Sequence, residues 1–195
     1  GQGATDIGTI PSQFYKLTGQ KVYNFGELGW NSRQSINQLI NLISIGHKPK
    51  RIIMYEGFND IGDCSKNKEQ IPTHAMEETV KESLIIRESL IYHFAKFISE
   101  PYLYISRRIQ PSQENNNEMI CSINEKRAKQ VANNLVTNLY TGFLISKSIE
   151  ADFKAILQPT FVNSNSYPPL KDEGQKLRAK NYKNQFDKVY PFILD

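Results

Sequence analysis

The first clear pattern of apolar and polar positions lies between Ser32 and Gly46. Apolar residues recur there at the i, i+3, i+4, i+7 spacing that places side chains on one buried helix face. They are Ile36, Leu39, Ile40 and Ile43. Ser32 is suited to cap the N-terminus of such a helix, and Gly46 is suited to end it. The pattern therefore predicts an amphipathic helix between these two residues.

Three short runs rich in β-branched, aromatic or aliphatic residues predict strands. They are 21–25, 51–55 and 153–157. The run at 51–55 is continuously apolar after its first residue, which is typical of a strand buried on both faces. A strand, a helix and a second strand in so few residues indicate a right-handed crossover and hence a parallel sheet.

The second half of the chain predicts longer helices. Helical spacing of apolar residues runs from Met76 to about Ile98, and again from a capping box at 122–125 through Phe143. A last helix is expected from about Asp172 to Tyr190. Residues 110–119 and 163–169 are polar and rich in Asn or Pro, which predicts loops.

Composition narrows the class of protein. The 195 residues include 39% hydrophobic and 11% aromatic side chains, which suits one globular domain over 1–195. The net charge of +4 is spread among 20 acidic residues, so no basic nucleic-acid-binding face is indicated. No apolar run reaches the ~20 residues of a membrane span. The chain starts at Gly1 rather than Met, which suggests a processed or cropped chain that is incomplete at both ends.

The cysteines allow two interpretations. Cys64 and Cys121 lack the paired spacing of a zinc site, and two unpaired thiols are the simpler expectation. A single disulfide is the alternative, and it would indicate an oxidising compartment. No metal or organic cofactor is expected.

In a parallel sheet, the loops that follow the strands meet at one edge. These loops are 26–31, 56–62 and 158–163, and the first two combine glycine with asparagine side chains. Backbone N–H groups in a glycine turn and an Asn amide can stabilise the negative oxygen that forms when a carbonyl becomes tetrahedral. The pattern is consistent with an oxyanion hole, although glycine-rich turns are also ordinary connections in α/β proteins.

Two of these loops resemble blocks of the SGNH hydrolases, the family that includes GDSL esterases and lipases. Residues 24–32, Asn-Phe-Gly-Glu-Leu-Gly-Trp-Asn-Ser, are similar to the second block, and residues 57–60, Gly-Phe-Asn-Asp, match the Gly-x-Asn-Asp of the third. The resemblance implies that the Gly29 N–H and the Asn59 side chain are oxyanion donors. Asp60 would organise the loop.

The same resemblance implies a fold and further residues. The fold would be a three-layer α/β/α, flavodoxin-like domain with a parallel sheet of about five strands. Residues 1–6 resemble the stretch after the nucleophile block, and residues 156–160 resemble a strand end of bacterial members. Gln158, at that strand end, is a candidate substrate contact because its side chain can face the crevice.

The chain departs from the family at both ends. The block with the nucleophilic serine would lie before Gly1, and the Asp-x-x-His block would lie after Asp195. None of His47, His74 and His93 has an Asp three residues before it. A serine needs a base to become nucleophilic, so we do not expect these 195 residues alone to hydrolyse an ester.

Three functions follow as alternatives. The first is a serine esterase domain of a larger parent protein, which acts on an O-acetyl carbohydrate or a short-chain lipid ester. The second is a catalytically inactive α/β module used for binding or assembly. The third is an interaction domain built on the two long helices, which would require a wide exposed apolar face.

Overall fold

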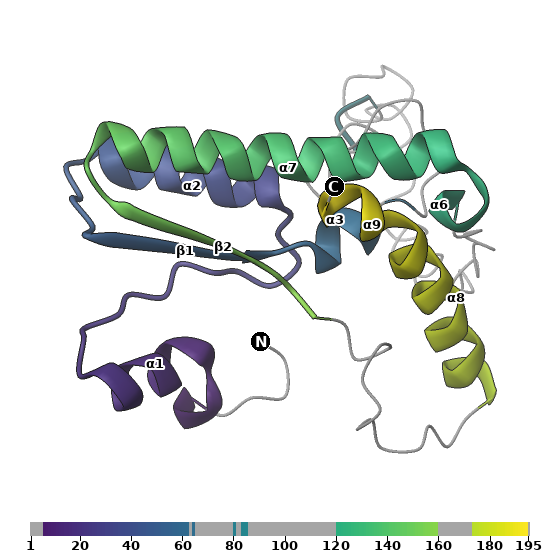
Figure 1. The fold of residues 1–195 in the computed structure, drawn as a ribbon, viewed down its shortest axis with the longest axis horizontal. Coiled ribbons are helices and arrows are strands. Elements are labelled where there is room, and N and C mark those ends of the chain that lie inside the picture. The colour runs from purple at the N-terminus through teal and green to yellow at the C-terminus, as the bar shows by residue number, and fades with distance from the viewer. Residues whose placement is uncertain are drawn as a thin grey trace, which may run out of the picture.

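The computed structural model describes residues 6–62, 64, 80, 83–85, 120–159 and 173–194. This part of the chain is mostly helical, with two strands (Figure 1). The elements are η1 (Asp6–Gly8), α1 (Ile10–Thr18), α2 (Ser32–Ser44), β1 (Arg51–Glu56), α3 (Phe58–Gly62), α6 (Ile120–Ile123), α7 (Glu125–Ser148), β2 (Asp152–Leu157), α8 (Glu173–Val189) and α9 (Pro191–Leu194).

The two strands form a parallel sheet. Arg51 is paired with Asp152 at one end of the register, and Glu56 is paired with Leu157 at the other. Figure 1 shows α2 and α7 on one side of these strands and α1 on the other. The parallel arrangement places the carboxyl ends of both strands at the same edge, as the sequence predicts.

Gly142 allows α7 to approach the sheet closely. A Cβ at this position would lie 3.0 Å from both the Ile36 side chain of α2 and the Met54 sulfur of β1, and 3.1 Å from the Phe153 ring of β2. This contact shows that α2 and α7 cover the face of the sheet that carries Met54 and Phe153. On the opposite face Ile53 is 42% exposed and Ile156 is 43% exposed, so the described helices cover that face incompletely.

A second core surrounds the N-terminal half of α7. Its buried members come from α3, α6, α7 and α8 and from residue 64, and they are Ile61, Cys64, Cys121, Ala128, Val131, Ala132, Phe186 and Val189. Cys64 and Cys121 form a disulfide within this cluster, with their Cα atoms 5.8 Å apart. The expectation of two free thiols is therefore wrong, and the alternative of a single bridge is confirmed.

Several predicted elements are confirmed and others are corrected. The helices at 32–44 and 125–148 and the strands at 51–56 and 152–157 form as expected, and α8 matches the last predicted helix. Residues 21–25 are not a strand and pair with neither of the described strands, so the strand predicted there is wrong. The described chain thus has a two-stranded sheet, and the expected count of about five strands is not observed in it.

The predicted helix caps are also corrected. Asn31 caps α2 and Asn124 caps α7, in place of Ser32 and Ser122. The predicted helix at 76–98 is described only at Val80 and at 83–85, which are helical. The loops predicted at 110–119 and 163–169 lie outside the described residues. Within the part that is described, no helix has the length and apolar character needed to cross a membrane.

Candidate active site

The turn before α2 is fixed by backbone conformation and by a capping box. Gly29 adopts a φ of +79°, in the left-handed region that favours glycine. The Asn31 side chain accepts a hydrogen bond from the Gln34 N–H at 3.2 Å, and the Gln34 side chain accepts one from the Asn31 N–H at 3.2 Å. These reciprocal bonds satisfy two amides at the helix start and hold the segment that follows Gly29.

A tight turn at Gly57 leads from β1 into α3. Gly57 has a φ of +121°, and a Cβ added to it would lie 2.7 Å from Leu157 Cδ1 of β2. Two residues later, the Asn59 Nδ2 donates a hydrogen bond to the Trp30 carbonyl oxygen at 2.6 Å. The Asn59 side chain is half-buried. The structure therefore brings Asn59 against the turn that contains Gly29. Asn59 lies in the helix α3, so the expectation of a loop over 56–62 is corrected.

Asp60 joins the same two segments through a buried network. Its carboxyl oxygens lie 3.1 and 3.0 Å from the Ser32 N–H, and the Ser32 hydroxyl donates to Oδ1 at 2.5 Å. The Asn138 Nδ2 of α7 donates to the Ser32 Oγ at 2.8 Å. All three residues are buried. Asp60 thus binds the first turn of α2, in agreement with a loop-organising role.

Glu56, at the carboxyl end of β1, is a second carboxyl group near the start of α2. It accepts a hydrogen bond from the Ser35 hydroxyl at 2.5 Å. Burial raises the pKa of Glu56 to about 7, the Ser35 hydrogen bond opposes this effect, and the nearby charge of Asp60 adds to it. Glu56 therefore changes its protonation state near neutral pH.

Gln158 lies directly beside this site. Its backbone N–H donates to the Glu56 carbonyl at 2.7 Å, and its carbonyl accepts a hydrogen bond from the Tyr190 hydroxyl at 2.5 Å. Burial raises the pKa of Tyr190 to about 12, with a smaller contribution from Tyr55, so the phenol remains a hydrogen-bond donor at neutral pH. The half-buried Gln158 side chain thus sits at a fixed backbone position next to the loop of Asn59.

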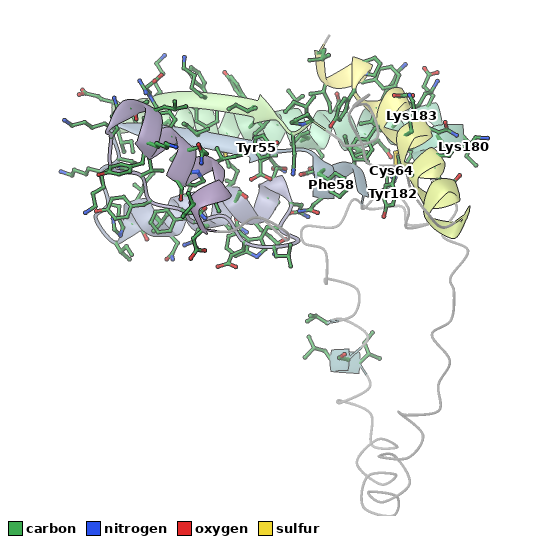
Figure 2. All side chains as sticks on the ribbon, turned by 90° about the horizontal axis from the view of Figure 1, so that it is seen from below. Tyr55, Phe58, Cys64, Lys180, Tyr182 and Lys183 are labelled. Carbon is green, nitrogen blue, oxygen red and sulfur yellow. A yellow bond between two sulfur atoms is a disulfide. The ribbon has the colours of Figure 1, made fainter. Side chains whose placement is uncertain are left out.

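Aromatic packing anchors α3 on its other side. Figure 2 shows Phe58, Cys64 and Tyr182 together where α3 meets α8, with Tyr55 further back along β1. The Phe58 ring stacks on Tyr182 with centroids 6.2 Å apart and on Phe186 with centroids 5.4 Å apart. The helix that carries Asn59 is therefore held between the turn before α2 and the core around the disulfide.

The sequence prediction missed four residues of this site. They are Ser32 in its actual role, Ser35, Glu56 and Asn138. A signal existed for Asn138, because it follows Val131 and Leu135 on α7 at helical spacing and so is a polar residue within an apolar stripe. The contacts of Glu56 and Ser35 depend on how α2 crosses β1, which the local pattern does not specify.

The described residues include no group of three or more His, Cys, Asp and Glu side chains that could hold a metal ion. The chemistry that this part of the site can offer is hydrogen-bond donation from Asn59 and from backbone N–H groups, beside two carboxyl groups. Comparison of the chain with protein-family profiles, with curated proteins and with solved structures finds no significant match.

Proposed function

We propose that this chain is part of a serine esterase domain of the SGNH hydrolase type. In this proposal the Gly29 N–H and the Asn59 amide stabilise the oxyanion during hydrolysis of an ester such as an O-acetyl carbohydrate or a short-chain lipid ester. The observation that supports it is the 2.6 Å hydrogen bond from Asn59 to Trp30, the residue that follows Gly29. This bond holds the Asn59 amide against the residue next to Gly29.

The hydrogen-bonding capacity of Asn59 is consistent with this role. A side-chain amide has two N–H donors. One N–H of Asn59 is bound to the Trp30 carbonyl, and within the described ranges the second meets no hydrogen-bond acceptor. An amide fixed by one N–H can direct the other at a substrate oxygen without first reorganising, which is the property that an oxyanion donor needs.

In this proposal β1 and β2 belong to a larger sheet. They are two strands of a parallel sheet of about five, in a three-layer α/β/α domain. The partly exposed Ile53 and Ile156 would then lie under the second layer of helices. The nucleophilic serine would come from residues before Gly1 of the parent protein, and the Asp-x-x-His from residues after Asp195.

Hydrolysis of p-nitrophenyl acetate by the full-length parent protein tests this function. We expect Asn59→Ala to lower kcat by ~10²–10³-fold, as loss of one oxyanion donor usually does. Asn37→Ala is the matched control, because Asn37 is an exposed asparagine on α2. A folded full-length protein without esterase activity would contradict the proposal. In an active protein, a loss below about tenfold in Asn59→Ala would contradict the role of Asn59.

A further inference from the structure

Asn138 is a polar residue in the apolar interior between α7 and α2. Its side chain is 2% exposed, and its Nδ2 donates to the Ser32 Oγ, a residue 106 positions away in the sequence. Burial of an amide is unfavourable unless its hydrogen bonds are made. The hydrogen bond to Ser32 therefore replaces a bond that Asn138 would make to water at the surface.

The hydrogen bonds of Ser32 give this contact a direction. A serine hydroxyl has one proton to donate and two lone pairs that accept. The Ser32 hydroxyl donates its proton to Asp60 Oδ1 at 2.5 Å, so its oxygen can only accept from Asn138. This fixes the Asn138 amide with its nitrogen toward Ser32. The chain of donors therefore runs from Asn138 through Ser32 to Asp60.

The end of this chain lies next to the proposed oxyanion donor. Asp60 binds the Ser32 N–H and hydroxyl, while its neighbour Asn59 binds the Trp30 carbonyl. Two adjacent residues of α3 thus bind the segment that enters α2, one at Trp30 and the other at Ser32. A hydroxyl that turned away from Asp60 would leave only the Ser32 N–H bound to that carboxyl group. The weaker contact would let α3 shift relative to the turn at Gly29.

We infer that Asn138 is a positioning residue, which sets the placement of Asn59 relative to Gly29 by orienting the Ser32 hydroxyl toward Asp60. This inference rests on the proposed function. Asn138 itself belongs to α7 and acts through its hydrogen bond to Ser32.

Kinetics of the full-length protein with p-nitrophenyl acetate test the inference. We expect Asn138→Ala to lower kcat by about ten- to a hundredfold with little change in KM, since a ~1 Å misplacement of a reacting group can cost ~10²-fold. Asn138→Asp is expected to lose more, because a carboxylate cannot donate to Ser32 and instead competes with Asp60 for the hydroxyl proton. Asn133→Ala, at an exposed position on the same helix, is the control.

A double-substitution cycle tests whether Asn138 affects kcat through Ser32. In a Ser32→Ala background the hydroxyl is absent, so Asn138→Ala should reduce kcat by less than about twofold further if the effect passes through Ser32. An equal loss of kcat in both backgrounds would overturn the inference. Asn138→Ser, which keeps a donor on a shorter side chain, replaces Asn138→Ala if the latter does not fold.

Hydrogen–deuterium exchange separates this inference from the esterase proposal. We expect backbone amides in 30–34 and 57–62 to exchange faster in the Asn138 variants than in the wild type or Asn133→Ala. Faster exchange in a protein without esterase activity would contradict the function and retain the link between Asn138 and α3. Unchanged exchange in a folded variant would overturn the inference, whatever the activity.

Discussion

The Asn59 side chain and the Trp30 carbonyl are joined by a 2.6 Å hydrogen bond between residues 29 positions apart in the sequence. Asn59 belongs to α3, which follows β1, and Trp30 belongs to the segment that enters α2. Asp60 makes a second connection between the same segments through Ser32. The relative position of these loops therefore depends on side-chain hydrogen bonds as well as on the sheet.

Gly29 should be sensitive to substitution because of its backbone conformation alone. A Cβ added at Gly29 would meet no atom of the described residues within 4 Å, but its φ of +79° is unfavourable for other residues. We expect Gly29→Ala to lower the free energy of unfolding by about 1–2 kcal/mol, and Gly29→Asn to lower it less, because Asn adopts this conformation more readily. Urea denaturation measures both values.

Gly62→Ala is the matched control for this prediction. A Cβ at Gly62 also meets nothing within 4 Å in the part of the chain that the structure describes, and its φ lies outside the left-handed region. Little loss of stability is expected in this variant. Equal losses in Gly29→Ala and Gly62→Ala would show that the left-handed conformation of Gly29 is not the cause.

Glu56 should make stability depend on pH in the range below neutrality. Its folded-state pKa of about 7 lies above the ordinary value of 4.5, so the folded state holds this proton more tightly than the unfolded state. The contribution is fully present below pH 4.5 and is lost as the pH rises through about 7. We expect up to about 3 kcal/mol of the free energy of unfolding to change over this interval.

Glu56→Gln isolates this contribution from the other titrating groups. The glutamine amide can still accept the Ser35 hydrogen bond, but it does not titrate. The difference in unfolding free energy between wild type and Glu56→Gln should therefore change in favour of the variant as the pH rises. A difference that stays constant between about pH 4.5 and 8 would show that Glu56 has an ordinary pKa in the folded protein.

The Cys64–Cys121 disulfide should contribute strongly to stability. It closes a loop across a sequence separation of 57 residues, for which loss of chain entropy in the unfolded state corresponds to about 4 kcal/mol. We expect reduction, or the double substitution Cys64→Ala and Cys121→Ala, to lower the melting temperature. The reductant should have no effect on the doubly substituted protein. Two reactive thiols in the unfolded, non-reduced wild type would contradict the bridge.

The elements that can be predicted from the sequence are those that the apolar pattern of their own residues determines. Helix α7 and strands β1 and β2 have periodic or continuous apolar residues, and this local signal is sufficient. The run at 21–25 has the composition of a strand, but a strand also requires a hydrogen-bonded neighbour, and the described structure provides none for it. Composition alone could not predict that outcome.

The site was predictable only where one residue type suggested a chemical role. Asn59 follows a strand end and a glycine, so its place at the carboxyl edge of the sheet is predictable, although the residue lies in the short helix α3 and not in a loop. Ser32 looked like a helix cap, but its hydroxyl donates to Asp60 and Asn31 caps the helix instead. Such a choice depends on a partner 28 residues away, which sequence periodicity does not reveal.

The parallel pairing of β1 with β2 also has a consequence for the order of folding. Arg51 and Asp152 form an ion pair across 101 residues, so the ends of a long chain segment must meet before the sheet exists. Once Cys64 and Cys121 are joined, the sequence separation of 57 between them no longer lengthens that path, and it becomes less than half as long. Each halving of a flexible loop lowers its closure cost by about 0.6 kcal/mol. Oxidation before strand pairing should therefore accelerate the assembly of the edge on which Asn59 and Gln158 lie.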